Sequence, residues 1–433
     1  MLASTAALVL VEVVVVDVER IDGGPRSAVV VGAGIVGLST AWFLQERGVE
    51  VTVVDRTSIA AGASWGNAGW IAPGLAIPLN EPSVLRYGLR SLLRPDAPLH
   101  VPLTVDPGLW SFLARFAVNC RWSSWTRAVA ANLPLNQEAV EAFDVLTANG
   151  VDATAVDAPI TAAFGTRRQA EGLLRELRRM SDAGQPVDHV ELDADRLREH
   201  VPLASSTLTA GVRVDGQRYT DPGAFVRALA RAVVSRGATV RLVEAVDISS
   251  HATGVTVHTR SGRAVTADVA VVATGAWLSR LARRWGVRVP VRAGRGYSFT
   301  VPVERPVPGP VHLPDVRVAC TPYQGGLRVA GTMEFRDPDA PGVHARLEAI
   351  TASARPLLDG VRWDERRDVW VGPRPVTPDG RALIGAVRAP HVYVAGGHGM
   401  WGLAQGPVTG RLLAERITTG KQPDALRAFD PLR

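Results

Sequence analysis

Apolar positions near the start of the chain follow a strand period, then a helix period, then a strand period again. The apolar run at 28–31 predicts a buried strand, and small and apolar residues at helical spacing then continue to about Arg47, with Gly48 as the stop. A second apolar run at 49–54 predicts the next strand. Strand, helix and strand in this order are typical of a parallel α/β unit.

The same α/β pattern returns in two later parts of the chain. The sequence TDP at 220–222 predicts a helix start, with proline at the first helical position, and a strand is expected at 238–248. A buried strand at 267–272 is followed by a tight turn and a helix. From residue 391 the chain repeats strand, glycine turn and helix.

Two other regions have different patterns. Residues 80–205 are rich in helical spacing, including an aromatic stretch at 108–129 that we interpret as a core-facing helix with a basic side, with contact to a membrane surface as the alternative. Residues 288–371 alternate apolar and polar positions between Pro/Gly-rich loops, which predicts a mostly antiparallel sheet. The predicted fold class is α/β (two-domain α+β), with a Rossmann-like domain from 26–80, 206–287 and 372–433 and an inserted substrate domain from 81–205 and 288–371, built on a mostly antiparallel sheet plus helices.

The turn after the first strand carries a GxGxxG pattern formed by Gly32, Gly34 and Gly37. A strand precedes the turn, a helix follows it, and Asp55 closes the second strand. Glycines let the backbone approach a pyrophosphate, the helix N-terminus stabilises its charge, and the Asp55 carboxylate can accept hydrogen bonds from ribose hydroxyls. The pattern predicts a dinucleotide site at which Asp55 would repel the 2′-phosphate of NADP, and it does not separate NAD from FAD.

A long Gly/Ala/Ser segment at 56–74 follows the second strand, where a nicotinamide-dependent dehydrogenase would continue its alternating pattern. Its small residues suit a backbone that lies flat beside a large planar ring. A flexible surface loop is the alternative, and Trp65 and Trp70, which favour burial, speak against it.

A second GxGxxG occurs at 397–402, in the sequence GHGMWG. No strand or terminal acid follows the next helix, so the pattern does not predict a second dinucleotide site. We interpret it as a helix N-terminus directed at the same cofactor, where the helix dipole would stabilise the negative charge of a reduced flavin.

Composition narrows the function classes. The 433 residues carry a net charge of +6 without a compact Lys/Arg run, so no nucleic-acid partner is expected, and a mild positive field suits an anionic substrate or membrane surface. Cys120 and Cys320 form no CxxC, which predicts no metal site and fits a reducing, cytoplasmic compartment, with peripheral contact at the inner face of the membrane left open. Residues 1–25 are apolar but contain Glu12 and no basic start, so we interpret them as an extension, or as a start codon placed too early, rather than a signal peptide.

The motifs together resemble the D-amino-acid oxidase and dehydrogenase superfamily, most closely the bacterial D-amino-acid dehydrogenases of the small-subunit type. They are VVGAGIVGLSTAWFLQERGVEVTVVDR, GNAGWIAPG, VATGAW, RGYSFTVP, GLRVAGTMEF, PRPVTPDGRALIG and GHGMWGLAQGPVTG, in family order from Arg26 to about Pro423. The resemblance implies FAD as the cofactor. It also implies oxidation of a D-amino acid by hydride transfer from Cα to flavin N5, which gives an imino acid that hydrolyses to a 2-oxo acid and ammonia. Cys320 lies outside the segment that attaches flavin in sarcosine-oxidase-like relatives, so the FAD is expected to be non-covalent.

The resemblance also implies roles for single residues. Arg374 matches the arginine that clamps the substrate carboxylate in the family, and prolines on both sides predict a stiff loop for it; a structural ion pair is the alternative. Tyr297 and Tyr323 are both candidates for a substrate-binding tyrosine, and neither is in register with the family. His398 is a candidate base, although hydride transfer from a neutral amine needs none, so we expect it to contact flavin or cap the turn. The expected cofactor-binding residues are Val31, Gly32, Gly34, Ile35, Val36, Gly37, Asp55, Arg56, Ser64, Trp65, Gly66, Asn67, Ala68, Gly69, Val246, Ala273, Thr274, Gly275, Trp277, Gly372, Arg374, Gly397, His398, Gly399, Met400, Trp401 and Gly402.

Electrons are expected to pass to a quinone or another carrier. Two alternatives stay open: an oxidase of the same fold that acts on glycine, sarcosine or D-hydroxyproline with oxygen, and a non-catalytic FAD-binding subunit of an electron-transfer complex. The substrate side chain, the preferred stereoisomer and the oligomeric state are not predicted by the sequence.

Overall fold

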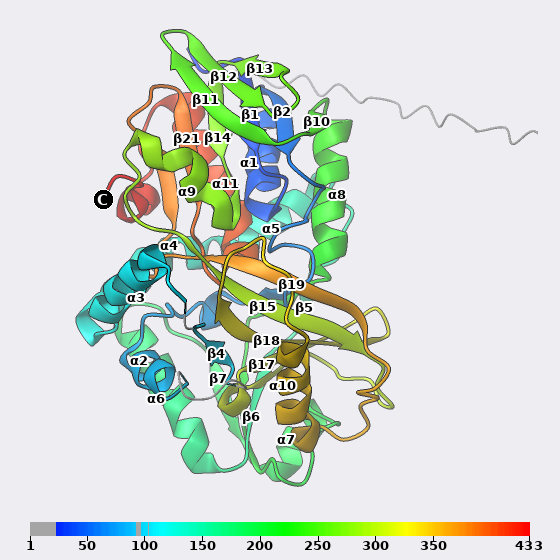
Figure 1. Cartoon of the computed structure of the whole chain (residues 1–433). Helices are drawn as coiled ribbons and strands as arrows, with labels where there is room; N and C mark the ends of the chain where they lie inside the picture. The colour runs from blue at the N-terminus through cyan, green and yellow to red at the C-terminus, as the bar shows by residue number, and fades with distance from the viewer. Residues whose placement is uncertain (1–22, 92–96, 103) are drawn as a thin grey trace, which may run out of the picture.

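The computed structural model describes residues 23–91, 97–102 and 104–433. The predicted extension at 1–25 lies outside the described residues except for 23–25. Figure 1 shows two halves: a parallel sheet flanked by helices in the upper half, and a large sheet in the lower half, with β15 and β19 between them. We call these halves the Rossmann-like domain and the large-sheet domain.

Six strands build the sheet of the Rossmann-like domain, in the order β10–β2–β1–β14–β21–β20. Only the edge strand β20 runs antiparallel to its neighbour. The chain places β2 and β10 on one side of β1 and β14 and β21 on the other, so the order reverses between β1 and β14, where open α/β sheets bind their ligands. The bounds are β1 (Ser27–Val31), β2 (Glu50–Asp55), β10 (Thr239–Leu242), β14 (Val269–Val272), β20 (Leu383–Ala386) and β21 (Val392–Gly396).

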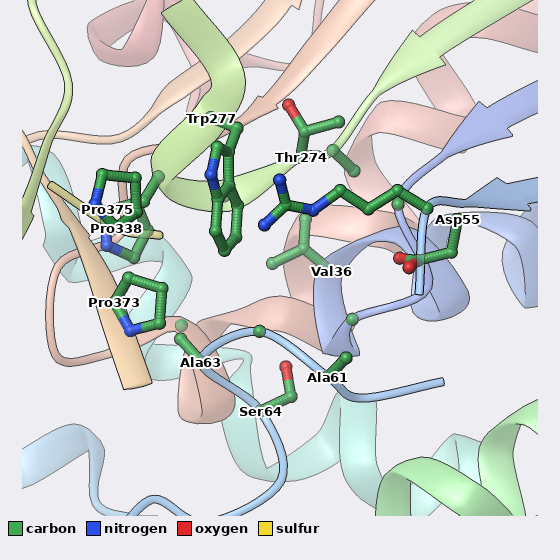
Figure 2. Close-up of a pocket in the computed structure, with 18 of the residues that line it drawn as sticks. Val36, Asp55, Ala61, Ala63, Ser64, Thr274, Trp277, Pro338, Pro373 and Pro375 are labelled. Atoms are coloured by element: carbon green, nitrogen blue, oxygen red, sulfur yellow. The ribbon is translucent and has the colours of Figure 1, made fainter. Parts of the chain in front are cut away.

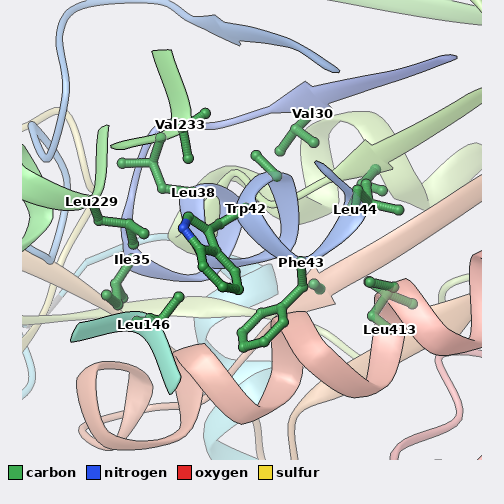
Figure 3. Close-up of a cluster of buried hydrophobic side chains, with 14 of the residues drawn as sticks. Val30, Ile35, Leu38, Trp42, Phe43, Leu44, Leu146, Leu229, Val233 and Leu413 are labelled. Carbon is green, nitrogen blue, oxygen red and sulfur yellow. The ribbon is translucent and has the colours of Figure 1, made fainter. Parts of the chain in front are cut away.

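Helices from distant parts of the chain share one core with this sheet. Trp42 and Phe43 lie edge to face with ring centroids 4.9 Å apart, and Figure 3 shows them among Leu38, Leu229 and Leu413. The predicted start of the helix after residue 220 is confirmed, because the side chain of Asp221 caps it by accepting from the Ala224 N–H. Most helical residues of this core come from α1 (Ile35–Gln45), α5 (Ala139–Ala148), α8 (Pro222–Ser235) and α11 (Gly402–Thr419).

A three-stranded antiparallel sheet is attached to this domain, formed by β11 (Ala245–His251), β12 (Gly254–Thr259) and β13 (Ala264–Ala267). The single strand expected at 238–248 is therefore two strands. Its first part, β10, joins the parallel sheet and its second part, β11, joins the antiparallel one.

The large-sheet domain is built on nine mostly antiparallel strands in the order β19–β15–β18–β17–β16–β6–β8–β7, with β4 paired to β18. On β6 the neighbours Ala162 and Ala163 enter different core clusters because successive side chains of a strand point to opposite faces. Helix α6 (Arg167–Asp182) covers one face, and α7 (Ala194–His200) and α10 (His344–Ala354) cover the other. The strands are β4 (Leu99–His100), β6 (Ile160–Phe164), β7 (His189–Leu192), β8 (Ala210–Val214), β15 (Arg292–Val301), β16 (Val311–Leu313), β17 (Val318–Tyr323), β18 (Gly326–Phe335) and β19 (Arg367–Val376).

The fold class predicted from the sequence is confirmed, but the domain boundaries differ at three points. Strand β8 follows the expected boundary at 206 yet pairs with β6 and β7 of the large sheet. Strand β19 crosses the expected boundary at 372 and stays in the large sheet to Val376. Helix α5, expected in the inserted domain, packs into the core of the Rossmann-like domain through Phe143 and Leu146. Strand pairing decides the assignments of β8 and β19. The hydrophobic face of α5 decides its assignment, and the helical period in the sequence does not indicate which domain that face will contact.

The aromatic stretch at 108–129 forms two helices instead of one. Helix α3 (Pro107–Asn119) begins at the Asp106 cap, and its last turn ends at Cys120, whose backbone is not helical; α4 (Trp122–Gln137) then starts. Helix α2 (Pro82–Ser91) precedes them, and η2 (Gly275–Trp277) and α9 (Leu278–Ala282) follow β14. The small strands β3 (Trp70–Ile71), β5 (Val156–Asp157) and β9 (Arg218–Tyr219) form a separate sheet. None of the described helices combines the length and the apolar character needed to cross a membrane.

Candidate FAD and substrate site

A cavity of about 530 Å³ lies at the carboxyl ends of β1 and β14 and extends to β19 of the large-sheet domain. Figure 2 shows Asp55 and Val36 toward one end, and Pro338, Pro373 and Pro375 toward the other. The cavity therefore reaches from the switch point of the parallel sheet to the large sheet. Its size is that of a typical small-molecule or cofactor site.

The first glycine turn packs so closely that side chains are excluded from it. Gly32 has a φ of +117°, and a Cβ on it would lie 2.5 Å from the carbonyl oxygen of Ala273 on the next strand. A Cβ on Gly37 would lie 2.0 Å from the carbonyl oxygen of Gly32. Helix α1 follows with no acidic residue in its first turn and no side-chain cap from Gly34, so the positive end of its dipole is left for an anion at the cavity.

Asp55 and Ser64 hold the turn in place from the cavity wall. The Asp55 carboxylate accepts hydrogen bonds from the N–H groups of Ala33 and Thr57, each at 2.9 Å. The Ser64 hydroxyl oxygen accepts from the N–H of Ile35 at 3.1 Å, so the segment at 56–74 contacts the helix start directly.

The second glycine turn brings α11 to the same cavity. His398, Gly399 and Gly402 line it, and α11 also starts without an acidic residue or a side-chain cap. The His398 Nε2 lies 3.0 Å from the Thr409 hydroxyl, and burial lowers the pKa of His398 to about 4, so the ring is neutral at neutral pH. The Gly399 N–H donates to the Pro375 carbonyl at 2.8 Å, which joins this turn to β19.

The residues present fit a bound FAD. Two helix N-termini without an acidic residue in the first turn meet one cavity, as a cofactor with a pyrophosphate and an electron-rich ring requires. Two cavity-lining side chains, Thr274 through Oγ1 and His398 through Nδ1, are buried there without a hydrogen-bond partner among the described residues. Such groups ordinarily find a partner, which a polar cofactor would supply.

Arg374 lies at the other end of the cavity, on β19 rather than on the stiff loop expected from its flanking prolines. It pairs with Gly294 of β15, and β19 is an edge strand, where prolines are tolerated because one side of the backbone needs no partner. Its Nη1 donates to the Thr332 carbonyl at 2.8 Å. No ion pair to a carboxylate is found for Arg374 among the described residues, and burial alone lowers the pKa of its guanidinium to about 10.

A β-bulge in β18 creates the space for this guanidinium. Arg295 pairs with Glu334, but Tyr297 pairs with Gly331, so β18 holds one extra residue opposite Gly296. A Cβ on Gly296 would lie 2.3 Å from the Arg374 Cζ. Within the bulge Thr332 adopts a φ of +66°, which is strained for a β-branched residue and directs its carbonyl to Arg374.

The two candidate tyrosines do not line the cavity. Tyr297 is buried on the opposite face of β15, where its hydroxyl donates to Glu334 at 2.6 Å, accepts from Arg295 at 2.8 Å and accepts from the Val343 N–H at 3.2 Å. Tyr323 ends β17, and burial raises the pKa of its hydroxyl. Strand parity explains the placement of Tyr297, since a shift of one position would have turned it to the cavity face.

Most of the expected cofactor residues line the cavity. The exceptions, which are not among the lining residues, are Gly37, Trp65, Gly66, Ala68, Gly69, Gly372, Gly397 and Trp401. The expected residues that do line it are Val31, Gly32, Gly34, Ile35, Val36, Asp55, Arg56, Ser64, Asn67, Val246, Ala273, Thr274, Gly275, Trp277, Arg374, His398, Gly399, Met400 and Gly402.

Several lining residues carried no local sequence signal. Trp370 packs where a Cβ on Gly66 or Gly372 would collide with its indole ring, which accounts for both glycines. Pro338 and Arg280 reach the cavity from a loop and a helix without a recognised motif. Pro373 and Pro375 could have been found, because they flank Arg374 in the sequence.

This fold and this cavity define a flavoprotein oxidoreductase with a two-domain architecture. Residues 27–416 match the family described as FAD dependent oxidoreductase (DAO), and the chain belongs to that family. FAD is its cofactor, and the resemblance seen in the sequence motifs is confirmed.

Curated relatives and solved structures agree with this assignment. D-amino acid dehydrogenase from Vibrio vulnificus (strain CMCP6) is 29% identical over 94% of this chain and 99% of the relative. D-amino acid dehydrogenase from Xanthobacter autotrophicus is 30% identical over 91% of this chain and 96% of the relative. Among structures, glycine oxidase from Geobacillus kaustophilus has a TM-score of 0.72 at 22% identity, over 94% of this chain and 98% of that one. L-α-glycerophosphate oxidase from Mycoplasma pneumoniae with FAD bound has a TM-score of 0.68 at 17% identity, over 90% of this chain and 94% of that one.

Proposed function

We propose that this protein is a D-amino acid dehydrogenase, which oxidises a D-amino acid to an imino acid that water then hydrolyses to a 2-oxo acid and ammonia. The observation that carries the proposal is Arg374, a desolvated guanidinium without a carboxylate partner among the described residues, at the wall of the FAD cavity. Such a group favours binding of an anion that brings its own carboxylate. Relatives of nearly the same length carry the name D-amino acid dehydrogenase.

The chain's own residues bind and orient the substrate. Arg374 holds the carboxylate by two parallel hydrogen bonds, while Gly296 leaves room for the guanidinium and the Thr332 carbonyl fixes its angle. FAD, when bound, would supply the oxidising power as a hydride acceptor. His398 stays neutral, and with its Nε2 engaged by Thr409 it contributes a polar ring nitrogen to the cofactor rather than a base to the substrate.

The electron acceptor is proposed to be a quinone or another carrier. The support is the name dehydrogenase shared by the curated relatives. The alternative is an oxidase that acts on glycine, sarcosine or D-hydroxyproline with oxygen as acceptor. The similar glycine oxidase structures favour it, but they show a shared fold only. A non-catalytic FAD subunit would have no use for an unpaired arginine at the cavity wall.

Anaerobic mixing of the purified FAD protein with D- and L-amino acids, glycine and sarcosine tests the proposal. We expect D-amino acids to bleach the flavin absorbance and L-isomers to leave it unchanged. Reoxidation is then followed with oxygen or with a quinone analogue. Bleaching by glycine or sarcosine alone, or reoxidation by oxygen faster than by the quinone, would select the oxidase alternative, and no bleaching by any compound would reject the substrate class.

A further inference from the structure

An exposed segment at 336–343 joins β18 to α10 and crosses the mouth of the cavity. It belongs to the large-sheet domain, yet Pro338 lines the cavity beside residues of the Rossmann-like domain (Figure 2). We call this segment the clasp.

The carboxylate of Asp339, in the clasp, accepts hydrogen bonds from three side chains of the Rossmann-like domain. Arg56 Nη2 lies 2.6 Å and Arg280 Nη2 lies 2.7 Å from its carboxylate, and the Trp277 Nε1–H donates to it at 3.1 Å. The Arg56 guanidinium also stacks on the Trp277 ring at 4.1 Å. Arg56, Trp277 and Arg280 all line the cavity, and the charged groups are partly exposed, so these contacts close its outer edge.

The other side of the clasp is fixed to the buried part of the large sheet. Arg295 donates to the Ala340 carbonyl at 2.7 Å and to the Pro341 carbonyl at 2.9 Å. The Tyr297 hydroxyl accepts from the N–H of Val343 at 3.2 Å. Because Arg295 and Tyr297 belong to β15, which is hydrogen-bonded to a strand on each side, the clasp is anchored at its base, and Asp339 is its attachment to the other domain.

We propose that the clasp retains FAD, and that Asp339 is the positioning residue that keeps it closed over the cofactor. A single exposed ion pair contributes little, but three donors on one carboxylate must be broken together before the segment lifts. Pro338 of this segment lines the cavity, so the proposal places the exit path for FAD beneath the clasp. The inference concerns the cofactor only and does not depend on the identity of the substrate.

The charge of Asp339 allows an opened clasp to be distinguished from an electrostatic effect on FAD. Removing the Asp339 charge leaves Arg56 and Arg280 with more positive potential toward the cofactor pyrophosphate, which by itself would slow the release of FAD. Faster release in Asp339→Asn therefore cannot come from long-range electrostatics and indicates an opened clasp.

The experiment measures the rate at which FAD leaves the loaded protein, followed by flavin fluorescence during dilution into an excess of a flavin-binding trap. We expect Asp339→Asn to release FAD at least about tenfold faster, equivalent to about 1.4 kcal/mol. Asp364→Asn, which removes an exposed carboxylate paired to Arg355 in the same domain, is the matched control and should leave the rate unchanged. The thermal midpoint of the FAD-free protein should be the same in both variants.

Trp277→Phe provides a second measurement, because it removes the Nε1–H donor while it keeps an aromatic ring. In a double-mutant cycle its effect on FAD release should be smaller in the Asp339→Asn background than in the wild type. The proposal is overturned if Asp339→Asn releases FAD no faster than Asp364→Asn, or if the two substitutions act independently. Bleaching by a D-amino acid plays no part in either readout, so failure here leaves the proposed activity untouched.

Discussion

The guanidinium of Arg374 donates a 2.8 Å hydrogen bond to the carbonyl of Thr332, a residue held at a φ of +66°. The strained backbone of one strand thus sets the direction of a charged group on another strand. Strain of about 1–3 kcal/mol at such a position persists only where the surrounding structure enforces it, and here the bulge opposite Gly296 does so.

Loss of the Arg374 guanidinium should weaken transition-state binding of a carboxylate substrate. We expect Arg374→Ala to lower kcat/KM, mainly by raising KM, because a buried charge pair with the substrate cannot form. The change corresponds to a loss of about 2–5 kcal/mol of transition-state stabilisation. Arg374→Lys should recover part of the loss, since it restores the charge without the bidentate geometry. Arg367→Ala is the control on the same strand: Arg367 donates to the Gln324 carbonyl and does not line the cavity. Equal kinetics in Arg374→Ala and Arg367→Ala would remove Arg374 from the site.

At position 332 a glycine variant should be more stable than an alanine variant, which is the reverse of the usual order in a strand. In an ordinary strand glycine is less stable than alanine by about 0.5–1 kcal/mol. At a positive φ only glycine is free of strain, so Thr332→Gly should have a higher free energy of unfolding than Thr332→Ala, by about 1 kcal/mol. Urea unfolding of the two variants measures this difference, and a less stable Thr332→Gly would contradict the strained conformation.

Gly37→Ala should impair FAD binding. The new Cβ would meet the Gly32 carbonyl at 2.0 Å, so the glycine turn or α1 must move. Gly172→Ala is a matched helical control, because nothing lies within 4 Å of its added Cβ, and alanine should stabilise α6 by about 0.5–1 kcal/mol. Flavin absorbance per protein after purification should fall in the first variant and stay constant in the second.

Stability should fall in mild acid because His398 is buried. The folded-state pKa of about 4 lies below the usual 6.5, so the unfolded chain binds more protons between these values. The contribution, about 3 kcal/mol, is complete above pH 6.5 and is lost as the pH falls toward 4. His398→Gln should flatten this part of the profile of urea midpoint against pH, whereas His344→Gln, at an exposed position on α10, should leave it unchanged.

The sequence indicated that the first glycine turn and Asp55 lie together, and both line the cavity, because this part of the site is local. Gly32, Gly34 and Asp55 belong to one strand–turn–helix–strand unit, whose spacing alone brings them to a single point. Arg374, singled out from the sequence, lines the cavity. Its strand was expected to be a loop because of the flanking prolines, but an edge strand accepts prolines that an interior strand would exclude.

The remaining parts depend on contacts between distant segments. Trp370 and Pro338 enter the cavity because two sheets meet there, and no local pattern records that meeting. Tyr297 was a reasonable candidate from its position beside the substrate region. The parity of β15 turns it to the opposite face, where it supports the clasp instead.

The parallel sheet draws its central strands from widely separated parts of the chain, with Val31 beside Val272 and Val272 beside Val394. During synthesis β1 and the first glycine turn leave the ribosome long before β14 and β21, so the growing polypeptide carries an open, apolar sheet edge. The cavity takes lining residues from β1, the turn after β14 and the start of α11, so it is complete only after α11 has been synthesised.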